Sequence, residues 1–581
     1  MNTTEASTLI DNDLECRKQF FPLNNFDSVL KLFEFELDSF EIPNFTFLSL
    51  VLGFIEDIFT AKKSNTSRIH SDTWLRYLSG VKNTNFIKVH RVYSSVAQKC
   101  PNSSPQSSSK GEKESEIRFP AIEWSAVEEL YNKFVNKIRT GFVNNNNERT
   151  ATKEIIKKVS DIIWSTLTKN YYKDKPHLQT LYSYSTGNKL DCFGVAFTVV
   201  AACQILGFHD VSLALSEDHA WVIYGEEGNK LSAEVTWHGK GDEHKRGQPI
   251  DFSSKQWLYL NGHAVKCTPK MIVSALVYSI NSTIDAKSES EELAVLQQKL
   301  LWLCYNRGHL QMYPMAVASL ADLEEISSTP GASVTPLQLF FEAIEIAKTK
   351  YDDHHVYPYE YLAIYYFRNA LYKDALTMLA KSAAVIAKYN CSRDDEEIFK
   401  YFVEASTNFI TDIFDEMKEK ISKSSDNCFY NLRDDARCLA ELLAYYDGLC
   451  EWEEAAPNNV IDTRFAKSFT DCLSAFPETT RQSVDIEHSE SYENCKRRKV
   501  SSNGDFECSV IKSEAITEPS LSKSENFPDE HSDKIRVTLR SYKMIAISGL
   551  LVSKKVNSSA IQLQLTAQSR TSVTKRRKIE I

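Results

Sequence analysis

The spacing of apolar residues predicts a mostly helical second half of the chain. From Ile272 to Tyr446, apolar positions recur every three or four residues almost without a break, which is the period of a helix with one buried face. Leucines keep this spacing from Leu293 to Leu303, after a Ser and Glu capping segment at 288–291 and before Gly308. A cap, an apolar face and a glycine stop together predict one complete helix.

One further helix and then a helix pair are predicted downstream of that stop. Thr335 and Pro336 are an N-cap and a first-turn proline for a helix over Leu337 to Tyr351. The next segment has small and aromatic residues at the spacing of a tetratricopeptide-type helix pair, at Tyr359, Leu362, Ala363, Tyr366, Ala375 and Leu379. A single such unit also fits an ordinary helical hairpin, so both interpretations stay open.

The region before residue 270 has a mixed pattern. Helical spacing covers Ala121 to Thr140 and Lys153 to Asn170, and a continuous apolar run from Val195 to Leu206 predicts a buried helix. Three short apolar runs then predict paired strands: Val211 to Ala214, Ala220 to Tyr224 and Ala233 to Trp237. The pattern is that of a small α+β part within a mainly helical protein.

No apolar run is long enough to cross a membrane. The longest, Phe47 to Ile55 and Val195 to Cys203, are well short of about 20 residues. The N-terminus has neither a basic start nor a following apolar stretch, so no secretory signal is expected and the chain is predicted to stay inside the cell.

Two stretches have too few apolar residues to fold by themselves. All eight Trp lie between Trp74 and Trp452, and beyond Thr479 the composition changes to Ser, Glu, Lys, Asp and Asn. A similar tract covers residues 100–118. Such segments bury too little apolar surface to offset their ordering entropy. Near the C-terminus, Tyr542 to Leu551 predicts a helix, and the alternation from Ala560 to Ala567 predicts a strand.

The predicted fold class is mainly α with a small α+β part and disordered tail segments. The 581 residues are too many for one small domain. The boundaries follow the changes in pattern: an N-terminal helical or hairpin region at 1–98, a disordered insertion at 99–118, an α+β domain at 119–270, a helical domain at 271–455, a C-terminal helical part at 456–479, a disordered segment at 480–535, a returning helix and strand at 536–570, and a basic tail at 571–581.

The charge distribution points to nuclear import. The formal net charge of -10 would repel a polyphosphate, so any nucleic-acid contact must be local. Two clusters concentrate positive charge in segments without periodicity: Lys496, Arg497, Arg498 and Lys499, then Lys575, Arg576, Arg577 and Lys578. Such clusters favour an importin-type groove. A weak nonspecific DNA contact and a simple solvated charge run are the alternatives.

The sequence predicts neither a metal site nor a nucleotide cofactor. Thirteen Cys is an odd count without a C-x-x-C pair, which is typical of reduced, mostly buried thiols. No P-loop and no G-x-G-x-x-G is present. The acidic run at 394–397 is interpreted as a solvated helix start.

One group of residues suggests thiol chemistry. Cys192 opens an apolar helix after Asp191, and its neighbourhood resembles the nucleophile helix of the transglutaminase-like superfamily. The segment from His219 to Val222 resembles the His strand of that superfamily, and Glu234 takes the place of an acid that orients the imidazole. If these three residues meet, they have the order of a Cys-His-acid triad. The preferred interpretation is a structural remnant, and catalysis by Cys192, His219 and Glu234 is the alternative.

Longer stretches resemble the menin family. They are Phe47 to Glu56, Lys157 to Trp164, Leu213 to Trp221, Ala233 to Gly241, Gln297 to Trp302, Leu320 to Glu325 and Asn557 to Ser569. The resemblance implies an N-terminal region, a transglutaminase-like domain, a tetratricopeptide-like helical domain and a smaller C-terminal part. It also implies a nuclear scaffold without catalysis, cofactor or membrane contact. The implied partners are a histone methyltransferase of the mixed-lineage-leukaemia type, a JunD-type transcription factor and a chromatin-reading coactivator.

The resemblance further implies a peptide pocket between the transglutaminase-like and helical domains. Its lining is expected at Ser216, Asp218, His219, Ala220, Tyr313, Met315, Tyr357, Tyr361, Glu397 and Glu404. Aromatic and methionine side chains would accept an apolar anchor, while carboxylates attract a basic peptide. By spacing alone, the same aromatic residues fit a helix-packing core. The chain departs from the family pattern at Phe193, Ala275, Glu360, Leu379 and Tyr401.

Overall fold

The structure, a computed structural model, is mostly helical with a small sheet part, which confirms the predicted fold class. It describes residues 14–61, 119, 121–142, 150–168, 175–226, 228–237, 243–285, 288–390, 396–415, 431–455, 459–489 and 534–567. The chain divides into two compact units, Met1–Met378 and Leu379–Ile581, each with its own core. The division falls inside helix α14 (Tyr372–Ile386). The domain boundaries expected from the sequence stay predictions.

In the described part of the first unit, five helices and one 3₁₀ turn precede residue 190, and a second 3₁₀ turn follows residue 240. They are η1 (Lys18–Phe20), α2 (Phe26–Ser39), α3 (Phe45–Thr60), α5 (Trp124–Gly141), α6 (Lys153–Trp164), α7 (Leu181–Gly187) and η3 (Glu243–Lys245). Helix α3 is apolar around most of its circumference and contacts α5 and α7, as expected for a helix covered on several sides. Arg17 and Glu36, both almost fully buried, form an ion pair beside it.

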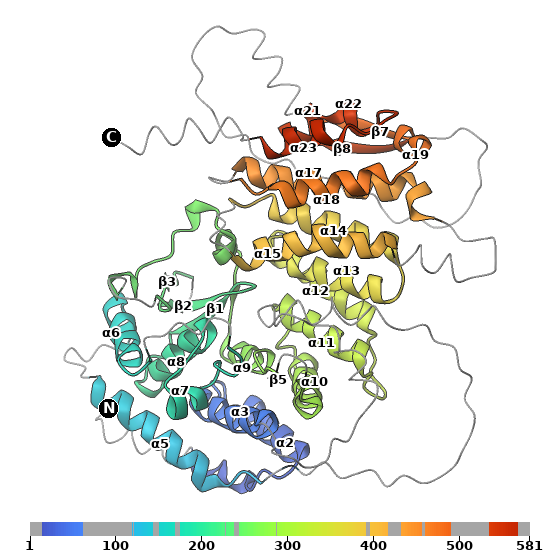
Figure 1. The fold of residues 1–581 in the computed structure, drawn as a ribbon. Helices are drawn as coiled ribbons and strands as arrows, with labels where there is room; N and C mark the ends of the chain where they lie inside the picture. The colour runs from blue at the N-terminus through green and yellow to red at the C-terminus, as the bar shows by residue number, and fades with distance from the viewer. Residues whose placement is uncertain are drawn as a thin grey trace, which may run out of the picture. The chain divides into compact units, whose positions relative to one another are not determined.

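A four-stranded antiparallel sheet lies against helix α8 (Cys192–Ile205) (Figure 1). Its strands are β1 (Ser212–Leu215), β2 (Ala220–Tyr224), β3 (Leu231–Ala233) and β4 (Val265–Lys266), in the order β3-β2-β1-β4. Leu215 pairs with Ala220, so residues 216–219 form the tight turn between β1 and β2. The first two predicted strands and the buried helix are therefore confirmed.

The third predicted strand is misplaced. Strand β3 covers Leu231–Ala233, not Ala233 to Trp237. Beyond Ala233 the chain leaves the sheet, because the backbone of Glu234 bonds to Gln248 and Gly247 instead of to β2. Val235 stays buried, whereas Trp237, the end of the predicted strand, is 40% exposed.

The rest of the first unit is a stack of helices joined by short elements. They are η4 (Phe252–Ser254), η5 (Trp257–Gly262), α9 (Pro269–Tyr278), β5 (Thr283–Asp285), β6 (Ser288–Glu289), α10 (Glu291–Asn306), α11 (Pro314–Ile326), α12 (Pro336–Tyr351) and α13 (Tyr357–Arg368). Helices α10 to α13 pack in sequence order. Ser290 caps α10 and Thr335 caps α12. The predicted starts of both helices are therefore confirmed within two or three residues.

The second unit is helical with one pair of strands. After α14 come α15 (Glu396–Glu404), a π-helical turn at Ala405–Phe409, η7 (Leu432–Asp434), α17 (Ala436–Ala455), α18 (Thr463–Ser474), α19 (Glu478–Gln482), β7 (Val484–His488), β8 (Ile535–Leu539), α21 (Tyr542–Ala546), α22 (Ser548–Leu551) and α23 (Ser558–Thr566). Strands β7 and β8 pair in parallel from Val484 with Ile535 to His488 with Leu539.

Two predictions for the C-terminal region are wrong in part. Residues 558–566 form a helix, not a strand, with Ile561 and Leu565 buried on one face. Residues 480–489, expected to be disordered, are ordered, because β7 pairs with a strand 51 positions further along the chain. Such a pairing gives no local signal in the sequence.

Other predictions lie outside the described residues. Both basic clusters, at 496–499 and 575–578, and the insertion at 99–118 belong to this group. Among the described helices, none combines the length and apolar character that a membrane-spanning helix needs.

Candidate functional site

Cys192 is the first residue of α8, as its sequence context predicts. Asp191 is the N-cap, and its Oδ1 accepts the backbone N–H of Gly194 at 2.7 Å. The N–H groups of a first helical turn lack intrahelical acceptors and carry the positive end of the helix dipole. The Cys192 side chain is half-buried, and its Sγ lies 3.9 Å from the carbonyl oxygen of Asp218. The thiol therefore faces the turn between β1 and β2.

That turn carries His219. The backbone N–H of His219 donates to Oγ of Ser216 at 3.0 Å, and the N–H of Ser216 donates to the His219 carbonyl at 2.9 Å. Nε2 of the imidazole hydrogen-bonds Oε2 of Glu234 at 2.9 Å, and the ring interacts electrostatically with Cys192. The three candidate residues Cys192, His219 and Glu234 thus lie together.

Both carboxylate oxygens of the buried Glu234 accept hydrogen bonds. Oε2 also accepts the Tyr259 hydroxyl at 2.8 Å, while Oε1 accepts the backbone N–H and the hydroxyl of Thr236 at 2.8 and 2.7 Å. Burial opposes ionisation of Glu234, but the charge of His219 and these hydrogen bonds lower the pKa of Glu234 to about 2. Burial also opposes ionisation of His219, yet Glu234 and Cys192 raise the pKa of His219 to about 10. The pair is therefore an imidazolium and a carboxylate near neutral pH.

Two acidic residues tie the same turn to the start of α13. Both oxygens of the buried Glu217 accept backbone N–H groups, from Val356 at 3.0 Å and Tyr357 at 2.7 Å. Asp218, half-buried, accepts the hydroxyl of Tyr357. Burial raises the pKa of Glu217 to about 8 against the effect of these donors. Of the predicted peptide contacts, the structure brings together Ser216 with His219 and Asp218 with Tyr357.

The other predicted contacts in the first unit are more deeply buried. Tyr313, Met315 and Tyr361 are 3%, 1% and 4% exposed, and Ala220, the first residue of β2, is also buried. The Tyr313 ring packs on Tyr278, and the Tyr361 ring stacks on Phe340. These side chains contribute to packing, and their contact with a peptide stays a prediction.

Glu397 and Glu404, the last two predicted contacts, belong to α15 in the second unit. Both are half-buried, and Oε1 of Glu404 accepts the amide of Asn408 at 2.6 Å. The positions at which the chain departs from the family pattern have different environments: Phe193 is half-buried, and Ala275, Glu360, Leu379 and Tyr401 are buried. A cavity lined by all ten predicted contacts stays a prediction.

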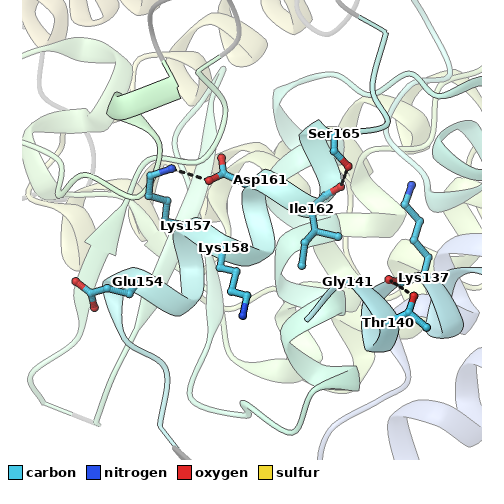
Figure 2. Close-up of a pocket in the computed structure, with 9 residues that line it drawn as sticks. All are labelled: Lys137, Thr140, Gly141, Glu154, Lys157, Lys158, Asp161, Ile162 and Ser165. Atoms are coloured by element: carbon cyan, nitrogen blue, oxygen red, sulfur yellow. Dashed lines mark hydrogen bonds and ion pairs between the residues drawn. The ribbon is translucent and has the colours of Figure 1, made fainter. Parts of the chain in front are cut away.

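A separate hollow lies between α5 and α6. It has a volume of about 680 Å³, and Figure 2 shows its lining: Lys137, Thr140, Gly141, Glu154, Lys157, Lys158, Asp161, Ile162 and Ser165. Nζ of Lys157 pairs with Asp161 at 2.6 Å. Ligand pockets combine apolar walls with a few convergent polar groups, whereas this hollow is lined mainly by long charged side chains. It contains none of the predicted site residues.

One group in the described part of the chain has the residue types of a metal site. Potential ligand atoms of His263, Asp352 and His354 lie within 4.8 Å of one another. However, the two imidazole rings stack face to face, with centroids 3.8 Å apart and an interplanar angle of 5°. Imidazole lone pairs lie in the ring plane, so stacked rings direct them side by side and not at one ion. The arrangement therefore lacks the geometry of a metal centre.

Several residues of this region were not predicted from the sequence. Thr236 and Tyr259 bind Glu234, and Trp257 donates its indole N–H to Glu217 at 3.1 Å. Thr236 lies two residues after its acceptor, a spacing typical of local side-chain turns. The aromatic residues at 257 and 259 come from a 3₁₀ segment whose approach to β2 is a tertiary contact, so no local pattern identifies them.

Comparison with known proteins places these features in a family. The menin family model matches residues 13–534 and 505–580. A solved structure described as the crystal structure of menin, which reveals the binding site for mixed lineage leukaemia (MLL) protein, is 37% identical in sequence. The match covers 94% of this chain and 99% of that chain, with a TM-score of 0.69. The chain belongs to the menin family.

Proposed function

We propose that this protein is a nuclear scaffold of the menin type that captures short basic segments of chromatin regulators. The observation that carries the proposal is the match over nearly the whole chain to a menin whose structure is described by its MLL-binding site. The proposed partners are a histone methyltransferase of the mixed-lineage-leukaemia type, a JunD-type transcription factor and a chromatin-reading coactivator.

The turn between β1 and β2 supports a basic peptide as ligand. Asp218 is half-buried, and Glu217 and Glu234 lie within the same neighbourhood. The partly exposed carboxylate of Asp218 attracts cationic segments and repels acidic ones. Tyr357 fixes the Asp218 carboxylate by donating its hydroxyl, so the carboxylate is already oriented before a peptide arrives. An oriented acceptor reduces the ordering cost of binding.

A calorimetric titration of the full chain with the N-terminal segment of the cognate methyltransferase tests the proposal. The wild type is expected to bind, and Asp218→Asn is expected to weaken binding about tenfold, because the amide keeps the shape but loses the charge. The loss should diminish at high salt, since screening weakens the interaction in the wild type.

Glu129→Gln is the matched control. Glu129 is exposed on α5, and its substitution changes the net charge by the same amount. The control should bind like the wild type. Absence of binding by the wild type at high micromolar concentration, or equal weakening by both substitutions, would rule out this turn as the peptide site.

Nuclear localisation is part of the proposal and rests on the two basic clusters. Replacing the Lys and Arg residues at 496–499 and 575–578 by neutral residues should leave a fluorescent fusion in the cytoplasm. The wild-type fusion should be nuclear. If the neutralised protein instead stays nuclear and loses only salt-sensitive DNA binding, the clusters are a nonspecific DNA contact.

A further inference from the structure

Cys192, His219 and Glu234 have an arrangement that peptide capture does not require. The thiol lies 3.9 Å from the carbonyl oxygen of Asp218, the residue before His219, and interacts with the imidazole, which bonds the buried carboxylate at 2.9 Å. The thiol is half-buried, while the side chains of His219 and Glu234 are 10% and 5% exposed. A nucleophile, a base and an acid that orients the base therefore occur in a direct chain, with the nucleophile at the most accessible end.

Hydrogen bonds hold the Glu234 carboxylate in one orientation. Glu234 accepts His219 and Tyr259 on one oxygen and two donors of Thr236 on the other. Because all of these contacts fix its plane, the carboxylate holds Nε2 of His219 and leaves Nδ1 as the nitrogen that can face the thiol. Orientation of the base by a buried acid is the arrangement that activates a nucleophile.

A donor beside the imidazole has no acceptor within the described residues. Trp221 is 1% exposed, its ring stacks on His219 with centroids 6.2 Å apart, and its indole Nε1 has no hydrogen-bond partner there. A buried N–H without an acceptor costs about 1–3 kcal/mol. Trp221 packs in the core against Tyr259, which also bonds the acid Glu234.

We propose that Cys192 is a catalytic nucleophile for acyl transfer from an ester or carboxamide carbonyl, with His219 as the group that gives and takes the proton and Glu234 as the positioning residue. The proposal goes beyond the scaffold function and does not depend on it. The site would add a covalent activity to a protein that also captures peptides.

The reaction balances in two steps. In the first, the thiolate of Cys192 attacks the carbonyl carbon beside the imidazolium of His219. The bond from that carbon to the leaving oxygen or nitrogen breaks, His219 gives its proton to the leaving group, and a thioester remains. In the second, water attacks the thioester while the now neutral His219 takes a proton from the water. The carbon–sulfur bond breaks, a carboxylic acid leaves, and the thiolate and imidazolium are restored.

The first experiment treats the full chain with 4-nitrophenyl acetate. The wild type should release a burst of 4-nitrophenol, and peptide mass spectrometry should locate the acetyl group on Cys192. Cys192→Ser should abolish the burst, and His219→Gln should slow it at least tenfold, because proton transfer by a positioned side chain is worth about 10²–10⁴ in rate. Cys472 is the internal control: it is also half-buried, but burial raises its pKa to about 12, so it should stay unmodified.

Glu234→Gln separates positioning from simple support of the fold. Loss of the negative charge lowers the pKa of His219, so the pH–rate profile of acetylation should move to lower pH. Tyr259→Phe removes a hydrogen bond to the same oxygen but keeps the charge, so it should slow the reaction without the same displacement of the profile. Thermal unfolding identifies any variant that does not fold.

Three results would overturn the proposal. They are a wild-type acetylation rate at Cys192 no higher than at Cys472, a rate independent of His219 in a folded His219→Gln variant, and an unchanged pH profile in folded Glu234→Gln. Peptide titration of Cys192→Ser keeps the two functions apart, since that variant should lose acetylation and keep peptide affinity.

Discussion

Gly194 illustrates at the residue scale how tightly the start of α8 is packed. A Cβ at this position would lie 2.5 Å from the carbonyl oxygen of Leu178 and 2.9 Å from a methyl group of Leu190. Gly194→Ala should therefore destabilise the protein by about 1–3 kcal/mol, the usual cost of overpacking. Because the clash separates α8 from the Leu178 segment, it should also slow acetylation of Cys192. Urea unfolding and the 4-nitrophenol burst measure the two effects.

Gly187 provides the comparison. It also lies in a helix, α7, but a Cβ there would meet nothing within 4 Å. Gly187→Ala should leave stability within about 0.5 kcal/mol of the wild type or raise it slightly, because alanine is the better helix former. Equal destabilisation by both substitutions would mean that space at Gly194 is not the cause.

At the scale of elements, the start of α12 depends on a capping box. Oγ1 of Thr335 accepts the backbone N–H of Gln338 at 3.3 Å, and the Gln338 side chain accepts the backbone N–H of Thr335 at 2.9 Å. Thr335→Ala should lower the free energy of unfolding by about 1 kcal/mol. Thr335→Ser keeps the hydroxyl, so its free energy of unfolding should fall by only a small part of this amount. Urea unfolding measures both changes. A loss with Ser equal to that with Ala would assign the effect to the threonine methyl group.

Helix α23 explains why one element was predicted incorrectly. Its buried residues, Ile561 and Leu565, are four positions apart. That separation belongs both to alternate positions of a strand and to one face of a helix, so the apolar pattern alone does not distinguish them. Asn557 decides the outcome, because its side chain accepts the N–H of Ala560 and caps a helix.

At the scale of the whole molecule, the second unit is completed by segments far apart in the sequence. Strand β8 pairs with β7 and contacts α17. Asp447 of α17 accepts the backbone N–H groups of Arg540 and Ser541. Lys543 forms a buried ion pair with Glu453. The residues from β8 to α23 are therefore part of the core of this unit.

Replacement of residues 490–533 by a Gly and Ser linker tests this organisation. Because the two strands are parallel, the linker must run from the end of β7 back to the start of β8. That distance is about 13 Å at 3.3 Å per residue. About 12 flexible residues can span it. Thermal unfolding of this variant should match the wild type. Termination after residue 533 should destabilise the unit by at least about 3–5 kcal/mol, because Glu453 stays buried without its cation. Equal loss in the two variants would show that 490–533 itself supports the fold.

The sequence by itself determined the helical character of residues 272–446, the capped starts of α10 and α12, the buried helix α8, the first two strands and the family. These features depend on residues within a few positions of one another, or on long matching stretches. It also identified Cys192, His219 and Glu234 as candidates. Tertiary structure decided that these three meet, that Tyr259 and Thr236 fix the acid, and that β7 finds β8. Contacts between residues far apart in the chain depend on how elements pack, and packing has no local period that a sequence displays.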